Sequence, residues 1–188
     1  MKLHGSYTSP YVRHCRIALA QTGLDCEFVE TDYEQSAAQS PACRVPFLHN
    51  GELMLTDSAS ILKYLREKAG QTFFEGVRDY DLFLLVNTAM DSTVNLFLLG
   101  KEGFTPETSA YLKRQQRRVD QTLKYLNRLI AETESGDWSD GRIRLGCYLS
   151  WALFRERLTL DDHPALAQLQ RQFEAEPLMA ATHPSKSG

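Results

Sequence analysis

In about the first 70 residues, the pattern of apolar positions switches between the period of a strand and that of a helix. Residues 2–6 predict a short first strand, and residues 26–30 alternate apolar and acidic side chains, as a strand with one buried face does. Between them, residues 10–22 carry apolar side chains at helical spacing, and Gly23 follows as a helix stop. This length suits a parallel strand–helix–strand crossover.

The next segment predicts a hairpin and a helix. Residues 31–42 are polar and indicate a loop with at most a short helix. Asn50-Gly51 lies between two apolar runs, a pattern typical of a type I′ turn that joins antiparallel strands. Thr56-Asp57 then opens a helix that closes near Gly70. The predicted order is β-α-β-α-β-β-α.

A domain boundary is predicted where regular periodicity is lost. Residues 72–79 follow a helix stop and contain a glycine without a helical or strand pattern. The predicted domains are therefore an α/β domain at residues 1–72 and an all-helical domain at residues 79–188.

Three long helices are predicted beyond the boundary. Residues 79–99 are apolar over most of their surface, which predicts a largely buried helix that Gly100 stops. Thr105-Pro106 is typical of a helix start, and an amphipathic pattern continues from there to Gly136. Residues 143–154 are apolar enough for a central buried helix. The basic run 113–118 is flanked by acids and is interpreted as a solvated face.

Composition indicates a soluble globular protein. Hydrophobic residues make up 43% of the 188 residues and charged residues 24%, and the net charge of −3 argues against nucleic-acid binding through a general basic field. The apolar stretch 82–99 is interrupted by Asn87, Asp91 and Asn95, which would be costly in a membrane, so we expect no membrane partner. A secretory signal is not indicated, so we expect a cytoplasmic protein.

The four cysteines predict neither a metal site nor a redox dithiol. They stand at positions 15, 26, 43 and 147, without a CxxC pair or a spacing typical of metal ligands. Reduced and mostly packed thiols are therefore expected, and we expect no bound metal and no resident cofactor.

Candidate chemistry is concentrated at Ser9-Pro10. Proline belongs in the first turn of a helix, so Ser9 is predicted at or next to the N-cap. Free N–H groups and the positive end of the helix dipole stabilise an anion or a thiolate there, and a hydroxyl can donate a hydrogen bond to it. The alternative is an ordinary cap that contributes about 1 kcal/mol to stability.

This segment also carries a resemblance to a known family. Residues 9–12, Ser-Pro-Tyr-Val, look like the Cys-Pro-Tyr-Cys turn of glutaredoxins with both cysteines replaced. Residues 5–13 resemble the serine-type active-site segment of bacterial and plant tau-like glutathione S-transferases. The resemblance implies a thioredoxin-like N-terminal domain followed by an all-helical domain, and that Ser9 hydrogen-bonds the glutathione sulfur. Tyr7 is an alternative donor, and Tyr11 is near enough in sequence to compete.

Two further motifs match the same family. Val45-Pro46 begins a strand, where a cis bond and an ordinary trans proline are both open; in the family this bond is cis and the valine backbone binds the cysteinyl part of glutathione. Asp57-Ser58 is predicted to cap a helix, and the resemblance implies that it also holds the γ-glutamyl group. Arg44 is the best-placed cation for the glycyl carboxylate.

In the helical domain the resemblance includes one departure. Ser139-Asp140-Gly141-Arg142 matches the family's Ser/Thr-x-x-Asp capping box except at its last position. Arg142 stands where the family has Asp, which puts the stability of that helix start in doubt, although Ser139 and Asp140 remain possible caps.

The resemblance predicts a glutathione transferase that conjugates the thiolate to small electrophiles in detoxification, as a two-fold homodimer. It also implies that the helix carrying Asn87, Asp91 and Asn95 lines the cleft for the second substrate; the alternative is a solvated edge. Two other functions stay open at this point. One is a binding module with the same fold and no catalysis. The other, a thiol–disulfide enzyme, would need a cysteine at position 9.

Overall fold

The computed structural model describes residues 1–133 and 136–186, and the chain divides into two compact units. The N-terminal unit comprises Met1–Glu75 together with Glu174–Gly188, and the helical unit comprises Gly76–Phe173. The described part of the C-terminal segment thus packs in the N-terminal unit, although the sequence placed it after the helical domain. The predicted domain limits, 1–72 and 79–188, stay a prediction.

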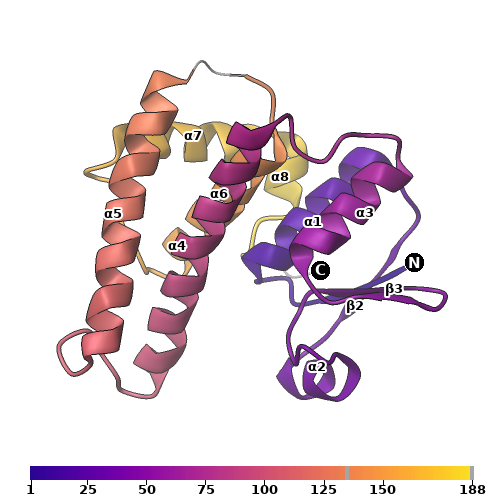
Figure 1. Ribbon diagram of the computed structural model, residues 1–188, viewed down its shortest axis with the longest axis horizontal. Helices are drawn as coiled ribbons and strands as arrows, with labels where there is room; N and C mark the ends of the chain where they lie inside the picture. The colour runs from indigo at the N-terminus through magenta and orange to yellow at the C-terminus, as the bar shows by residue number, and fades with distance from the viewer. Residues whose placement is uncertain (134–135, 187–188) are drawn as a thin grey trace. The chain divides into compact units, whose positions relative to one another are not determined.

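A mixed four-stranded sheet forms the centre of the N-terminal unit (Figure 1). Its strands are β1 (Lys2–Gly5), β2 (Glu27–Glu30), β3 (Phe47–Asn50) and β4 (Leu53–Leu55), in the order β2-β1-β3-β4. β1 pairs with β2 in parallel and with β3 antiparallel, and β3 pairs with β4 antiparallel. The element order and the thioredoxin-like fold predicted for this part of the chain are confirmed.

Helices α1 (Pro10–Thr22) and α3 (Ser58–Lys68) pack against each other beside the sheet, and α2 (Tyr33–Gln39) lies away from them (Figure 1). The side chain of Val12 explains why β1 ends in glycine, since a Cβ on Gly5 would lie 2.5 Å from its Cγ1. The predicted bounds of α1 and its left-handed Gly23 are confirmed.

The hairpin of the N-terminal unit is confirmed, but its predicted type I′ turn is wrong. The register pairs Asn50 with Leu53, so the two turn residues are Gly51 and Glu52. Only Gly51 has a positive φ, of 60°, whereas a type I′ turn needs positive φ at both central positions. Because Asn50 remains paired in β3, the turn lies one residue later than the sequence motif indicated.

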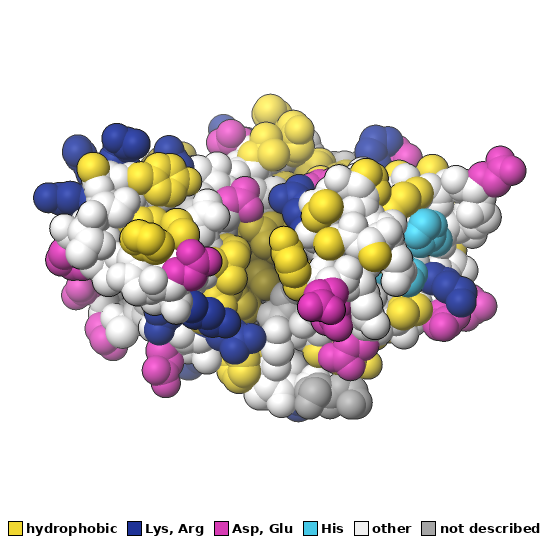
Figure 2. Space-filling model, turned by 90° about the horizontal axis from the view of Figure 1, so that it is seen from below, with side chains coloured by type: hydrophobic (Ala, Val, Ile, Leu, Met, Phe, Trp, Pro, Cys, Tyr) yellow, Lys and Arg dark blue, Asp and Glu magenta, His cyan; other side chains and the backbone are white. Residues whose placement is uncertain are grey.

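The helical unit contains α4 (Val77–Lys101), α5 (Ala110–Glu132), α6 (Asp140–Phe154) and most of α7 (Pro164–Ala175); α8 (Pro177–Ala181) belongs to the N-terminal unit. α4 packs on both α5 and α6. α6 is buried along almost its whole length, which confirms the predicted central helix. The basic residues at 113, 114, 117 and 118 on α5 are exposed, as predicted. Figure 2, in which α5 lies toward the left, shows basic side chains there with acidic ones beside them.

The limits of α4 and α5 differ from the predicted ones, which were residues 79–99 and Thr105 to Gly136. α4 continues through Gly100 to Lys101, and the chain reverses at Gly103, whose φ is +85°. α5 begins at Ala110 with Ser109 as its N-cap, because the segment from Thr105 to Thr108 closes a turn of its own through a hydrogen bond between the Thr105 N–H and the Thr108 hydroxyl. The observed caps, Glu102 at the end of α4 and Ser109 at the start of α5, therefore lie within four residues of the predicted Gly100 and Thr105.

The start of α6 is capped from another helix. Ser139 Oγ accepts the Arg142 N–H at 3.4 Å and donates to Asp79 Oδ1 of α4 at 2.5 Å, and Asp79 Oδ1 also accepts the Gly141 N–H at 3.0 Å. The absence of a Cβ at Gly141 leaves the space that this carboxylate occupies. Asp79 therefore supplies the acid that the sequence lacks at position 142.

α4 is long and apolar enough to cross a membrane by length and composition alone. One face is buried in the helical unit and carries the hydroxyls of Ser92 and Thr93, which bond Gln115 and Tyr148. The opposite face exposes apolar side chains, Leu84 at 43% and Leu98 at 50%. Those buried hydroxyl bonds are the contacts of a helix packed within a protein.

Candidate active site

The strand register brings three loops to one end of the sheet. Ser6–Ser9 follows the end of β1, Val45-Pro46 precedes β3, and Asp57 follows β4. Because His4 pairs with Phe47 and Leu48 pairs with Leu55, the end of β1, the start of β3 and the end of β4 coincide. The candidate residues predicted in the N-terminal domain therefore share one edge of the N-terminal unit.

Ser9 is the N-cap of α1 and retains an unused donor. Its backbone is extended, with φ −74° and ψ 127°, and its Oγ accepts the Val12 N–H at 3.4 Å. Pro10 occupies the first turn, as predicted. Among the residues that the structure describes, no oxygen accepts a hydrogen bond from the Ser9 hydroxyl, and the side chain is partly exposed. A donor is thus held beside the positive end of the α1 dipole.

Tyr7 is held by an aromatic and cationic cluster. Its ring lies 4.7 Å from the Phe28 ring, and the Arg16 guanidinium lies 4.7 Å from the Tyr7 ring centroid. Burial lowers the pKa of Arg16, while the neighbouring Tyr7 acts in the opposite direction. No sequence pattern singles out Arg16 and Phe28, because they come from two other elements of the fold, α1 and β2. Tyr11 lies in the first turn of α1 and is partly buried.

The Val45–Pro46 bond is cis, which decides between the two alternatives that the sequence left open. Pro46 is buried and Val45 is partly exposed. The ladder between β1 and β3 begins at Phe47, so the Val45 backbone lies outside the paired part of the sheet.

Asp57 caps α3 and pairs with Arg44. Its Oδ1 accepts the Ala59 N–H at 2.8 Å, and its Oδ2 lies 3.0 Å from Arg44 Nη2. Both side chains are more than half exposed, and exposed pairs of this kind contribute about 0.2–1 kcal/mol. A charged ligand can therefore replace either partner of this ion pair at a small cost in free energy.

Ser58 and Cys15 join the two helices of the site. Ser58 is buried, and its carbonyl oxygen lies 4.0 Å from the Cys15 Sγ. Cys15 has no exposed surface. A buried thiol packed against α3 has the surroundings of a structural cysteine rather than those of a reactive one.

The three polar residues predicted for a second-substrate cleft lie on α4. Asn87 is half-buried, with its Oδ1 buried and without a hydrogen-bond partner among the described residues. Asp91 and Asn95 are exposed. Their spacing places the three on one face of α4, and their role in a cleft stays a prediction.

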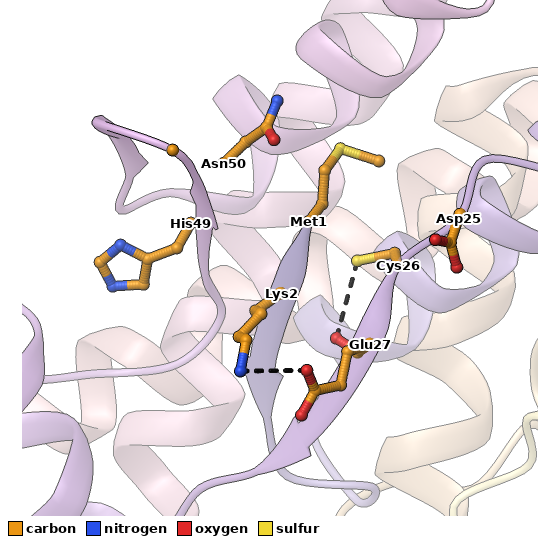
Figure 3. A pocket seen from close by; sticks show the side chains of 8 residues that line it. Met1, Lys2, Asp25, Cys26, Glu27, His49 and Asn50 are labelled. Carbon is orange, nitrogen blue, oxygen red and sulfur yellow. Dashed lines mark hydrogen bonds and ion pairs between the residues drawn. The ribbon is translucent and has the colours of Figure 1, made fainter.

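A hollow in the N-terminal unit lies at the opposite end of the sheet from Ser9. It has a volume of about 560 Å³ and is lined by the starts of β1 and β2 and by the hairpin (Figure 3). Lys2 and Glu27 form an ion pair of 3.1 Å there, and burial raises the pKa of the nearby Cys26 thiol. The hollow contains none of the predicted site residues, and its cysteine is disfavoured as a thiolate.

The chain is similar to known proteins in sequence and in fold. Residues 3–73 match the family model described as the glutathione S-transferase N-terminal domain. A probable glutathione S-transferase of Oryza sativa subsp. japonica is 35% identical over 75 residues, which cover 36% of this chain and only 35% of that protein. A glutathione S-transferase of Triticum aestivum is 24% identical over 97% of this chain and 92% of its own length.

Solved structures resemble the chain over nearly its whole length. A glutathione S-transferase of Methylobacterium radiotolerans, in complex with glutathione sulfonate, is 25% identical with a TM-score of 0.84, over 100% of this chain and 96% of its own. One from Methylobacillus flagellatus, with glutathione bound, is 23% identical with a TM-score of 0.86, over 97% and 98%. Residues 3–73 therefore match a glutathione S-transferase N-terminal domain, and nearly the whole chain shares the fold of the solved glutathione S-transferases.

Proposed function

We propose that the protein is a glutathione transferase of serine type that conjugates the thiolate of glutathione to small electrophiles. The observation that carries the proposal is Ser9. Its Oγ accepts the cap hydrogen bond of α1, while its hydroxyl proton has no acceptor among the described residues. A bound thiolate beside this cap receives both that hydrogen bond and the field of the helix dipole.

The chemical task of the site is to lower the pKa of the glutathione thiol. A decrease of about two units corresponds to about 2.7 kcal/mol and makes the thiolate a substantial species at neutral pH. The thiolate is the nucleophile in the addition to an electrophile. Ser9 is the donor in this proposal. Tyr7 is the weaker candidate, because Arg16 and Phe28 hold its ring.

The remaining residues of the sheet edge bind the tripeptide in the proposal. The Val45 backbone aligns the cysteinyl part, with Pro46 beside it, and Asp57 and Ser58 hold the γ-glutamyl group. Arg44 exchanges its pairing with Asp57 for the glycyl carboxylate, a charge-assisted contact. Support comes from two similar structures, one with glutathione bound and one in complex with glutathione sulfonate.

Glutathione affinity and turnover have to be measured together, because a non-catalytic binding module shares the fold. Calorimetry gives the affinity, and a panel of small electrophiles gives the rates. The panel includes a double-bond isomerisation, because two proteins of similar fold, a maleylacetoacetate isomerase and a maleyl pyruvate isomerase, are 21% and 17% identical to this chain. Binding with conjugation supports the proposal, and binding without any turnover contradicts it.

We also propose that the protein is a cytoplasmic two-fold homodimer. α4 exposes Tyr80 at 46% beside Val77 and Leu84, an apolar strip that a partner can cover. Light scattering at micromolar concentration tests the assembly. A mass of twice 21.4 kDa supports the dimer, and a mass of 21.4 kDa contradicts it.

A further inference from the structure

A groove of about 170 Å³ in the helical unit is lined by side chains from three segments of helix. The end of α5, the start of α6 and the first turns of α7 contribute to it. Its apolar surface consists of Ile130, Ala131, Ala165 and Leu169, and its polar surface of Thr133, Arg142, Gln168 and Gln172. We call it the Arg142 groove, because Arg142 is the one charged residue among these described lining residues.

The Arg142 guanidinium lies near an aromatic ring that packs on a second ring. It lies 5.5 Å from the Trp138 ring centroid, and the Trp138 ring in turn meets the edge of the Phe173 ring at 5.4 Å. Its Nε is buried and has no hydrogen-bond partner within residues 1–133 and 136–186. No ion pair reaches the guanidinium within the same residues. Arg142 is thus a half-buried cation near an aromatic ring, and one of its donors, Nε, has no acceptor among the described residues.

The neighbouring helix ends do not need this cation. At the end of α5, Thr133 bonds two of the last carbonyls, donating its hydroxyl to Leu129 O at 2.7 Å and its N–H to Ile130 O at 3.3 Å. At the start of α7, Asn127 Oδ1 accepts the N–H groups of Ala165 and Leu166. Both ends are capped by their own partners, so the Arg142 charge is left for another acceptor.

Burial makes a missing acceptor unfavourable. Desolvation lowers the pKa of Arg142. An arginine nevertheless stays protonated in proteins, so the charge remains and has to be solvated. A planar anion satisfies it best, because the guanidinium fork matches a carboxylate with two parallel hydrogen bonds.

We propose that the Arg142 groove binds a short-chain aliphatic carboxylate. The carboxylate pairs with the Arg142 guanidinium, the side-chain amides of Gln168 and Gln172 offer further donors, and the alkyl chain lies on the partly exposed Ile130 and Ala165. A groove of about 170 Å³ has room for a small carboxylate such as butyrate. No residue of the proposed glutathione site lines it.

Calorimetric titration of the full chain with butyrate tests the proposal, with butyramide as the neutral ligand of the same shape. We expect saturable binding with a Kd on the order of 1 mM, and binding of butyramide that is about tenfold weaker or more. Arg142→Met should remove butyrate binding. Arg128→Met, at an exposed position of α5, is the matched control and should leave it unchanged.

A second pair of variants keeps the arginine in place. Gln168→Glu and Gln172→Glu put a carboxylate beside Arg142 and should each weaken butyrate by about tenfold or more, with glutathione-dependent activity unchanged. The proposal is overturned if Arg142→Met binds butyrate as the wild type does, if butyramide binds equally well, or if the titration does not saturate. Because the groove and the glutathione site share no residue, those results leave the proposed function unaffected.

Discussion

The serine caps of α1 and α6 have the same local geometry and different surroundings. Ser9 Oγ accepts the Val12 N–H at 3.4 Å, and Ser139 Oγ accepts the Arg142 N–H at the same distance. The Ser139 hydroxyl proton is donated to Asp79, whereas the Ser9 hydroxyl has no acceptor among the described residues. The destination of one proton thus distinguishes a cap that serves the fold from a cap that can serve a ligand.

Ser109, the cap of α5, shows that an unused hydroxyl is not sufficient. It accepts the Leu112 N–H at 3.4 Å, as the other two serines do with their third helical residue. It stands alone at a helix start, whereas Ser9 shares its sheet edge with Arg44, Val45 and Asp57. A functional interpretation of Ser9 therefore depends on the convergence of loops as well as on the free donor.

The largest expected effect concerns Asp79, which serves only the structural cap. Asp79→Ala leaves the Ser139 hydroxyl and the Gly141 N–H without their acceptor, and should lower the free energy of unfolding by about 2–3 kcal/mol. Asp81→Ala, an exposed acid on the same helix, is the control and should change it by less than about 0.5 kcal/mol. Urea unfolding measures both. Equal effects of the two substitutions would mean that Asp79 does not support α6.

The next largest effect is expected at Ser9, where a substitution should change turnover more than stability. Ser9→Ala should lower turnover about ten- to a hundredfold, or about 1.4–2.7 kcal/mol, while glutathione affinity changes less. Ser139→Ala should leave turnover unchanged and lower the free energy of unfolding by about 1–2 kcal/mol. Steady-state kinetics measure the turnover of both variants, and urea unfolding measures their free energies of unfolding. A fully active Ser9→Ala variant would transfer the donor role to Tyr7 or Tyr11.

Asp57 is a third kind of cap, because its side chain both caps a helix and forms an ion pair. One carboxylate oxygen caps α3 and the other pairs with Arg44. Asp57→Ala should therefore weaken glutathione by about 1–2 kcal/mol, because a charged group of the ligand loses its partner. Calorimetry measures the affinity. Unchanged affinity together with lower stability would make Asp57 a structural cap like Ser139.

The smallest effect is expected at Tyr7. Tyr7→Phe keeps the ring between Phe28 and Arg16 and removes only the hydroxyl, so turnover should fall by less than about threefold, or about 0.7 kcal/mol. Tyr7→Leu removes the aromatic face and serves as the comparison, with a larger decrease expected. A loss of tenfold or more in Tyr7→Phe would argue for a phenol donor.

The N-terminal unit was predictable because its signals are local. The start and stop of α1 are set by Ser9, Pro10 and Gly23, all adjacent to the helix they limit. The hairpin followed from one dipeptide, although the pairing of Asn50 moved the turn by one residue. The position of the Ser9 segment beside Val45 and Asp57 was inferred from resemblance, and only the strand register gives it a physical basis.

Contacts between segments that are far apart in the chain could not be predicted from the sequence. The acid that caps α6 is Asp79, some 60 residues before the helix it serves. The Arg16 contact with Tyr7 requires the packing of α1 on β2 to be known. Likewise, the sequence suggested that Arg142 breaks the capping box of α6. In the structure Asp79 supplies the missing acid of that cap, and Arg142 lines a groove.

The pKa of bound glutathione tests the central claim most directly. Thiolate absorbance is titrated against pH in saturated wild type, in Ser9→Ala and in Ser139→Ala, which controls for the loss of a serine cap. We expect the wild type and Ser139→Ala to hold the thiol about two units below its free value, and Ser9→Ala to return it to within about half a unit of that value. A Ser9→Ala titration that coincides with that of the wild type would contradict the account.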